Sequence, residues 1–303
     1  MEKVGDGQTR TARGGCPRAL NMAADSDTEL IDLMHLGRDR VIGAWRVGDV
    51  IVDPGPSSCL PTLLEALEGR PPRALALTHV HLDHAGAAGS LVARFPELEV
   101  WVHARGAPHM IDPARLMASA TRLYGDDMQR LWGEMLPVPA ERVRVLHGGE
   151  LMGPFRVAYT PGHASHHVSY LHQGSGLAFT GDVTGVRIGD GIVLAPTPPP
   201  DVDLSAWRSS LDLVDSWAPD ALAITHFGGH EDVSEHLAAM RAALQESETM
   251  ARDLDEPAFV AAVRARVADS VADPETAACY EQAVPADQSF HGLLRYLRGE
   301  RAG

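Results

Sequence analysis

Four side chains that can bind a metal ion lie within six residues of one another, in the stretch A-L-T-H-V-H-L-D-H-A-G at residues 76–86. They are His79, His81, Asp83 and His84. Alternate side chains of an extended segment point the same way, so His79 and His81 can bind one ion. Asp83 and His84 lie where the chain begins to coil and can turn toward a neighbouring ion. Imidazole and carboxylate are the ligands of zinc, iron and manganese sites, so the stretch predicts a metal centre rather than an ordinary polar turn.

Three later segments end in the same way, with a threonine that closes a predicted strand and a metal-binding side chain within three residues of it. The segments are Y-T-P-G-H at 159–163, F-T-G-D at 179–182 and I-T-H at 224–226. A single histidine or aspartate after a strand is usually a structural turn residue. Together with the first stretch, however, His163, Asp182 and His226 complete a set of seven candidate ligands, which is enough for two ions.

With these motifs the chain closely resembles the metallo-β-lactamase-fold hydrolase superfamily. The matching pieces are T-H-V-H-L-D-H at 78–84, T-P-G-H at 160–163, T-G-D at 180–182 and T-H at 225–226, with V-D-P-G at 52–55 ahead of them. The resemblance covers about residues 30–245 and is nearest to the glyoxalase II and lactonase-like branch. It implies an α/β (α+β) fold, a four-layer αββα sandwich with the metals at one edge between the two sheets.

The resemblance also implies a role for each candidate ligand. The first metal would be bound by His79, His81 and His163, the second by Asp83, His84 and His226, and Asp182 would bridge the two. Two such ions can share a water and lower its pKa toward neutrality, which gives a hydroxide nucleophile. Asp83 and Asp182 are therefore the candidate catalytic residues, with Asp83 orienting the nucleophile or protonating the leaving group. Asp53 and His167 are expected behind the ligands, where they would orient them.

The elements that must position these residues follow from the apolar pattern. Strands are predicted at 40–47, 49–53, 73–78, 98–103, 142–146, 155–159, 167–171, 176–180 and 221–225, the first two as a hairpin, and a second hairpin at 188–193. Helices are predicted at 61–67, after Asp203, after a capping box of Asp232 and Glu235, and at three places beyond residue 256. We expect a disordered tail at 1–24, a catalytic domain at 25–245 with two inserted helices at 105–140, and a C-terminal helical extension at 246–303.

Composition limits the classes of function. The formal net charge of −15 disfavours nucleic acid and anionic membrane surfaces as partners. The three cysteines, Cys16, Cys59 and Cys279, are far apart and predict no disulfide framework. No apolar run reaches the length of a membrane span, and residues 1–24 lack the apolar core of a secretory signal, so we expect a cytoplasmic protein. Met22 is an alternative start to Met1.

The substrate is less well defined by the sequence. Thr184 and Arg187 follow the predicted bridging aspartate and can contact substrate. Arg187 is either an anchor for a carboxylate or phosphate or the partner of an acidic neighbour at the surface. Tyr124 lies among four methionines in the inserted segment, which could line an adaptable apolar pocket or simply pack as helix faces. A lone lysine at Lys3 argues against β-lactamases that bind their substrate through a lysine. No tyrosine lies between 182 and 226, where lactonases usually have one.

The sequence therefore predicts a hydrolase of an ester, thioester or lactone of a small metabolite, acting through a metal-bridging hydroxide. The expected cofactor is two divalent ions, zinc first and iron or manganese as alternatives. A mononuclear iron oxidoreductase of the persulfide dioxygenase kind is the alternative, and a non-catalytic metal-binding protein is the third. The C-terminal helices could cover the active site or form a homodimer interface.

Overall fold

The computed structural model describes residues 27–299, and within them two sheets make up the β-structure. The first sheet runs in the order β1 (Thr28–Asp32), β2 (Gly43–Val47), β3 (Val50–Val52), β4 (Ala74–Ala76), β5 (Glu99–His103) and β6 (Val143–Leu146). The second runs β12 (Gly228–His230), β11 (Ala221–Ile224), β10 (Leu177–Phe179), β9 (Val168–His172), β8 (Phe155–Tyr159) and β7 (Leu151–Met152). Strands β3 to β6 are parallel, as are β10 and β11, and the other neighbours are antiparallel.

The alternation of side chains along the short strands separates two hydrophobic cores. In β4, Ala74 and Ala76 pack between the sheets, whereas Leu75 faces the helices. In β11, Ala223 lies in the inner core and Leu222 in the outer one. Because both faces of these strands are buried, each strand reads as a continuous apolar run rather than an alternating one. The inner core also holds Trp45, Trp101, Phe155, Tyr170 and Phe179.

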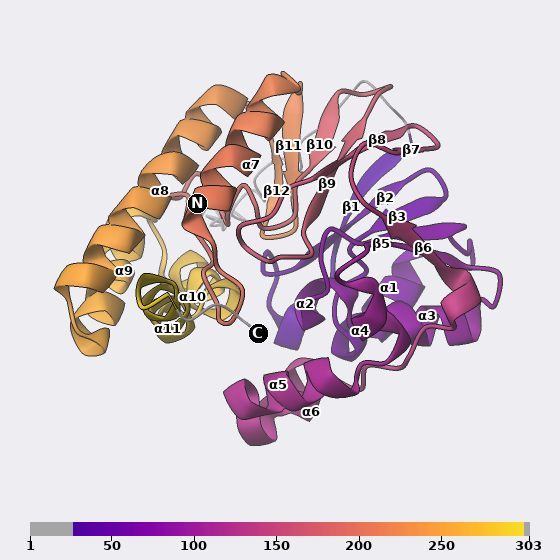
Figure 1. Ribbon diagram of the computed structural model, residues 1–303, viewed down its shortest axis with the longest axis horizontal. Coiled ribbons are helices and arrows are strands. Elements are labelled where there is room, and N and C mark those ends of the chain that lie inside the picture. Colours follow the sequence, from indigo (N-terminus) through magenta and orange to yellow (C-terminus); the bar gives the residue numbers. More distant parts are fainter. Residues whose placement is uncertain (1–26, 300–303) are drawn as a thin grey trace, which may run out of the picture.

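Helices cover the outer faces of both sheets (Figure 1). On the first sheet they include α1 (Leu60–Ala66) and α3 (Ala88–Arg94), and on the second α7 (Leu204–Ser216) and α8 (Val233–Asp253). A cluster of α9 (Glu256–Ser270), α10 (Pro274–Ala283) and α11 (Ala286–Leu297) packs beside α8. The result is the expected mixed α/β fold, with helices, sheet, sheet and helices in four layers.

The remaining helices lie near the edge where the parallel strands end. The short helix α2 (Leu82–Ala85) carries part of the first motif, and α4 (Ala107–Ile111), α5 (Ala114–Tyr124) and α6 (Met128–Leu131) fill the segment between β5 and β6. That segment holds three helices where two were expected. Its methionines pack rather than line a pocket, since Met110, Met128 and Met135 are buried in the core.

Three local predictions differ from the structure. At 188–193 the chain turns back as predicted, but a single antiparallel bridge between Val186 and Leu194 closes the turn, so no pair of strands forms there. Residues 221–225 are not the last strand, because β12 follows; two of its three residues are glycines, and it lacks the β-branched pattern of a strand. The Asp232 side chain does not cap α8, since it pairs with Arg187 at 2.7 Å instead.

Other predictions are confirmed or lie outside the described residues. The β2–β3 hairpin is antiparallel as expected, and Asp203 caps α7 by accepting from the backbone N–H groups of Ser205 and Ala206. Cys59 and Cys279 are unpaired. The tail at 1–24, Met22 and Cys16 lie outside residues 27–299. No helix within that range is long and apolar enough to cross a bilayer.

Candidate metal centre

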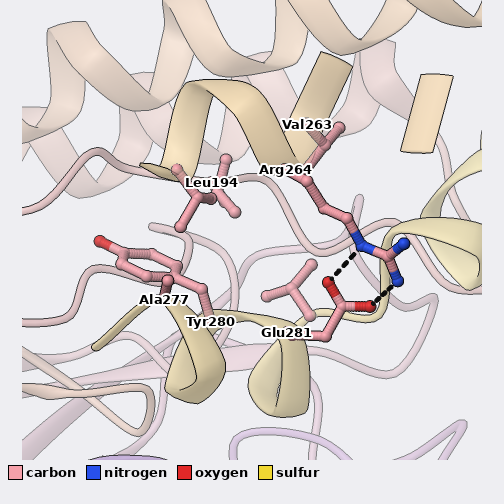
Figure 2. Close-up of a pocket in the computed structure, with 8 residues that line it drawn as sticks. Leu194, Val263, Arg264, Ala277, Tyr280 and Glu281 are labelled. Carbon is pink, nitrogen blue, oxygen red and sulfur yellow. Dashed lines mark hydrogen bonds and ion pairs between the residues drawn. The ribbon is translucent and has the colours of Figure 1, made fainter. Parts of the chain in front are cut away.

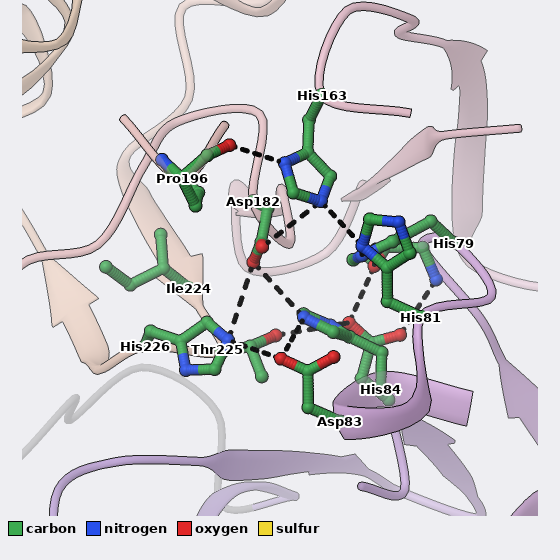
Figure 3. Close-up of polar contacts among 12 residues, drawn as sticks. His79, His81, Asp83, His84, His163, Asp182, Pro196, Ile224, Thr225 and His226 are labelled. Atoms are coloured by element: carbon green, nitrogen blue, oxygen red, sulfur yellow. Dashed lines mark hydrogen bonds and ion pairs between the residues drawn. The ribbon is translucent and has the colours of Figure 1, made fainter. Parts of the chain in front are cut away.

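The seven candidate ligands come from four segments that end at the same edge of the two sheets. The loop after β4 and helix α2 supply four of them, and the turns after β8, β10 and β11 supply His163, Asp182 and His226. Parallel strands bring their carboxyl ends to one edge, so segments more than 140 residues apart in sequence meet there. Figure 3 shows all seven side chains converging.

One group of nitrogens is formed by three histidines. His79 Nε2 and His163 Nε2 each lie 2.9 Å from His81 Nδ1. The three atoms belong to a set whose members all lie within 4.8 Å of one another. His79 and His163 are buried and His81 is partly exposed, so the group has one side open to solvent.

A second group mixes carboxylate and imidazole. Asp83 Oδ2 lies 3.3 Å from His226 Nε2 and 3.7 Å from His84 Nε2. These three side chains form another set within 4.8 Å. Asp83 retains 21% side-chain exposure, whereas His84 and His226 are almost fully buried.

Asp182 connects the two groups through its two oxygens. Its Oδ2 lies 3.4 Å from His163 Nε2, in the first group. Its Oδ1 lies 3.2 Å from His84 Nε2 and 3.7 Å from His226 Nε2, in the second. One carboxylate therefore faces both groups, which is the arrangement a bridging ligand requires.

The far side of each of three histidine rings is held by an acceptor. His163 Nδ1 donates to the Pro196 carbonyl at 2.8 Å, and His226 Nδ1 donates to the Val41 carbonyl at 2.5 Å. His84 Nδ1 lies 2.8 Å from Asp53 Oδ2. A proton on Nδ1 leaves the lone pair on Nε2, so all three rings direct a metal-binding atom into the centre.

Asp53 lies behind the centre, as its position after β3 predicted, and it is completely buried. Its Oδ1 accepts the Thr78 backbone N–H at 2.8 Å. Its Oδ2 accepts the hydroxyls of Thr78 at 2.7 Å and Thr225 at 3.1 Å, besides the His84 contact. One carboxylate thus ties the first motif to the turn after β11.

The electrostatics of the centre keep carboxylates ionised and the first group neutral. Burial raises the pKa of Asp182, but His84, His163 and His226 around it lower that pKa well below its usual range. Burial, together with its neighbour His163, lowers the pKa of His81 to about 4. Ionised carboxylate and neutral imidazole are the protonation states that metal binding needs.

A second observation that fits divalent metal ions is that several buried polar atoms of these side chains have no hydrogen-bond partner. Among the described residues, His84 Nε2, Asp182 Oδ1 and His226 Nε2 are shielded from solvent and make no hydrogen bond. Buried polar groups are almost always satisfied, and unsatisfied ones call for an explanation such as a bound ion. Nitrogen and oxygen donors in two groups of this size suit zinc, iron or manganese.

Two histidines of the P-G-H-A-S-H-H stretch adjoin the centre without entering it. The His167 ring lies against His79, with centroids 5.2 Å apart, and its Nδ1 contacts the Thr160 hydroxyl at 2.9 Å. No hydrogen bond joins His167 to any of the seven ligands among the described residues, so its contact is one of packing. His166, for which the sequence suggested no role, accepts the Val80 N–H on Nδ1 at 3.3 Å. It holds the backbone between His79 and His81.

A cavity of about 870 Å³ opens above the centre. Asp83, Asp182 and His226 are among the residues that line it, with His81 and His163. The opposite walls come from α5, the proline-rich connector at 196–200 and the segment from Gln282 to Arg295. The centre therefore lies within reach of a small molecule.

The three predicted substrate contacts are placed differently with respect to this cavity. Tyr124 lines it, and its hydroxyl donates to Gln288 Oε1 at 3.3 Å. Thr184 and Arg187 are not among the lining residues. The Thr184 hydroxyl lies 2.6 Å from that of Thr180, and Arg187 pairs with Asp232. Proximity in sequence to Asp182 did not bring these two side chains into the cavity.

Sequence reasoning also missed His35, which joins three parts of the cavity wall. Its ring stacks on Trp132 with centroids 5.4 Å apart, and Nε2 donates to the Leu131 carbonyl at 2.9 Å. The amide nitrogen of Gln282 donates to Nδ1 at 3.0 Å. A lone histidine in an irregular segment gives no signal in the sequence that could have identified it.

Residues 48–230 match the metallo-beta-lactamase superfamily, which is more than half of the chain. The metallo-beta-lactamase fold-containing protein of Sulfurisphaera tokodaii is 30% identical over 175 residues, 55% of this chain and 65% of that protein. A hydroxyacylglutathione hydrolase of Xylella fastidiosa is 33% identical over 149 residues, 49% of this chain and 45% of the enzyme. The chain thus spans about half to two thirds of the length of these curated relatives.

Solved structures show the same fold. An archaeal metallo-beta-lactamase superfamily protein from Sulfolobus tokodaii superposes with a TM-score of 0.65 at 20% identity, covering 88% of this chain and 97% of that one. A protein named TTHA1623, solved in a di-iron-bound form, has a TM-score of 0.51 at 29% identity and covers 63% of this chain and 88% of its own.

Proposed function

Because this chain belongs to the metallo-beta-lactamase superfamily, we propose that it is a metal-dependent hydrolase that cleaves an ester, thioester or lactone of a small metabolite. The observation that carries the proposal is the position of Asp182, whose two oxygens each face one group of candidate ligands. A site for two ions at the end of a large cavity is what hydrolysis of a small substrate needs. The hydroxyacylglutathione hydrolases among the relatives support the same reaction class.

In this proposal His79, His81 and His163 hold the first ion, Asp83, His84 and His226 hold the second, and Asp182 contacts both. When bound, two divalent ions supply a hydroxide at neutral pH and polarise the carbonyl of the substrate. The chain itself orients the ligands through Asp53 and the Pro196 and Val41 carbonyls. Asp83, ionised and partly exposed, is the group placed to accept a proton from the nucleophile or return one to the leaving group.

Metal identity, compartment and partners complete the proposal. Nitrogen-rich tetrahedral donor sets favour zinc, while the di-iron form of TTHA1623 keeps iron open for a related site. We propose a cytoplasmic enzyme with a small-molecule substrate and no nucleic-acid or membrane partner, in keeping with the net charge of −15 and the unpaired cysteines. A homodimer through the C-terminal helices is part of the same hypothesis.

The test is a hydrolysis screen of metal-reconstituted protein on ester, thioester, lactone, phosphodiester and β-lactam substrates, with metal analysis. We expect two ions per chain and turnover of at least one carboxylic ester, thioester or lactone, and we expect Asp182→Ala to lose both. Hydrolysis that persists in Asp182→Ala with full metal content would refute the proposal. One iron per chain with thiol-dependent oxygen uptake would instead identify the persulfide dioxygenase-like alternative.

A further inference from the structure

The cavity above the metal centre carries a set of arginines that no residue between 27 and 299 neutralises. We propose that these arginines bind an anionic part of the substrate, a carboxylate or phosphate remote from the bond that is cleaved. The inference rests on the proposed hydrolase function and narrows its substrate to anionic esters or thioesters.

The arginines of this cavity differ from most others in the chain by lacking partners. Arginines elsewhere are commonly paired, as Arg142 is with Glu97 and Arg241 with Asp212. Four arginines line the cavity, and their side chains make no ion pair or hydrogen bond within the described part of the chain. They are Arg105, Arg115, Arg122 and Arg295. Unpaired guanidinium groups are therefore concentrated where a substrate would enter.

These four side chains come from three separate segments around the cavity. Arg105 follows β5, and Arg295 lies on α11. Arg115 and Arg122 lie on α5 seven residues apart, which places them on one face of the helix. In Figure 1, α5 lies at the bottom of the view, below the two sheets, and α11 lies to its upper left, beside α9 and α10. An anion in the cavity would be approached by positive charge from more than one side.

None of the acidic residues that line the cavity forms an ion pair with the four arginines within residues 27–299. Asp83 and Asp182 belong to the metal centre. Asp127 pairs with Arg130 at 3.0 Å, and Asp201 accepts the Ser165 hydroxyl at 2.5 Å. Asp201, whose partner is a neutral hydroxyl, keeps its negative charge, so outside the metal centre the four arginines face one carboxylate without a cationic partner. A local cluster of cations also counters the repulsion that a protein of net charge −15 exerts on an anionic substrate.

Arg295 gives the most specific indication of a ligand. It is half-buried, and its Nε is shielded from solvent without a hydrogen-bond acceptor among the described residues. Because Nε is shielded, a ligand in the cavity would be bound through the two terminal nitrogens of the guanidinium, which are not shielded and make no hydrogen bond within residues 27–299. Guanidinium is also the side chain that binds carboxylate and phosphate with two parallel hydrogen bonds.

A smaller cavity of about 210 Å³ provides a contrast in the same helical cluster (Figure 2). Its lining is largely apolar, with Leu194, Val263 and Tyr280, and its single arginine, Arg264, pairs with Glu281 through two contacts of 2.9 and 2.5 Å. An arginine beside a cavity is therefore neutralised where no anion is needed. Arg264 supplies the matched control for the experiment.

The experiment compares three thioesters of one acyl group whose thiol part ends in a neutral amide, a carboxylate or a phosphate. Metal-reconstituted wild-type protein, Arg295→Gln, the double variant Arg115→Gln/Arg122→Gln and Arg264→Gln are assayed for kcat and KM. For wild type we expect a lower KM for one or both anionic thioesters, and their comparison identifies which anion is bound. Each cavity arginine lost should raise that KM by about tenfold, because a hydrogen bond to a charged group is removed. Added salt should reduce the difference, and Arg264→Gln should behave as wild type.

Equal KM values for neutral and anionic thioesters, or an equal loss for both in the cavity variants, would overturn the inference and leave the hydrolase function intact. If no thioester or other ester is hydrolysed by metal-loaded protein, the proposed function itself fails. Calorimetry of metal-free protein with inorganic phosphate and with succinate then decides on the arginines alone. Binding that Arg295→Gln abolishes would support the anion site, and no binding by wild type would refute it.

Discussion

Replacing Asp53 by asparagine should weaken one of the two metal positions through the protonation of a single ring nitrogen. Asp53 has a positive φ of 51°, a backbone conformation that asparagine also adopts readily, so the change is nearly isosteric and leaves the turn in place. Its Oδ1 accepts one hydrogen bond, from the Thr78 N–H, and its Oδ2 lies against two hydroxyls and His84 Nδ1. The amide oxygen must replace Oδ1, because an amide NH₂ there would face a backbone donor.

The NH₂ group of the introduced asparagine would consequently lie opposite His84 Nδ1. Two N–H groups cannot face each other at 2.8 Å, so the imidazole would carry its proton on Nε2 instead. That is the atom directed at Asp83 and Asp182, and a protonated Nε2 cannot bind a metal. Loss of such an orienting contact usually costs 10- to 100-fold in metal affinity, or about 1.4–2.7 kcal/mol of binding free energy.

The assay is a competition titration with a chromophoric chelator, combined with metal analysis, for wild type, Asp53→Asn and Asp49→Asn. Asp49 is a suitable control because it lies at the other end of β3, in the turn between β2 and β3. It is exposed, and its side chain pairs only with Arg73 among the described residues. We expect Asp53→Asn to keep one ion at nearly wild-type affinity and to bind the second more weakly. Two ions bound at wild-type affinity would refute the tautomer argument. An equal loss at both positions would show that Asp53 acts on the whole fold rather than on His84.

Two further predictions concern packing and pH. Gly162 has a φ of 141°, and a Cβ there would lie 2.3 Å from Trp207 Cα. Gly162→Ala should therefore lower the free energy of unfolding by about 3 kcal/mol and reduce the metal content through His163. Gly189→Ala, where the Cβ would meet open space, should cost about 1 kcal/mol, and denaturant titration measures both changes. Burial and the neighbour His236 lower the pKa of His230 to about 4. Since its unfolded pKa lies near 6.5, the unfolded chain binds more protons between pH 6.5 and 4, and stability should fall as pH falls through that window. In metal-free protein, the stability lost between pH 7 and 5 should be about 1–2 kcal/mol smaller for His230→Gln than for wild type. A control variant at an exposed position, His147→Gln, should show the wild-type dependence of stability on pH. Equal dependences for His230→Gln and wild type would contradict the prediction.

The sequence predicted most of the strands and the seven converging side chains because their signal is local. Each strand that leads to the centre is followed by a threonine and, within three residues of it, by a side chain with metal-binding chemistry. Three of these four strands are continuous apolar runs, and β8, with the exposed Arg156, is not. Asp53 and the first motif follow the parallel strands β3 and β4, and Asp182 and His226 follow the parallel strands β10 and β11, so within each sheet these carboxyl ends lie at one edge. What the pattern could not express is geometry between distant residues, such as the separate contacts of the two Asp182 oxygens with His163 and His84.

The cavity walls were poorly predicted for the same reason. Thr184 and Arg187 were chosen by their closeness in sequence to Asp182, yet the turn after β10 directs Arg187 to Asp232, at the start of α8. Arg295, in contrast, is 113 residues beyond Asp182 in the printed sequence and still lines the cavity. Amphipathic helices such as α5 and α11 give a strong periodic signal, but periodicity does not state which element an exposed face will meet.

His35 shows how the walls of the cavity are joined to one another. Its ring nitrogens hold Leu131 of the inserted segment and Gln282 of the C-terminal helices, and Tyr124 makes a second link between these parts through Gln288. The metal centre is built from turns that the two sheets fix, whereas the walls that would bind the rest of a substrate are fixed by side-chain contacts between insertions. Under the proposed function, changes in the inserted segment or the C-terminal helices would therefore alter which anion is bound while the seven candidate ligands stay in place. This separation explains why the ligand motifs support a proposal for the reaction class but carry no information on the substrate.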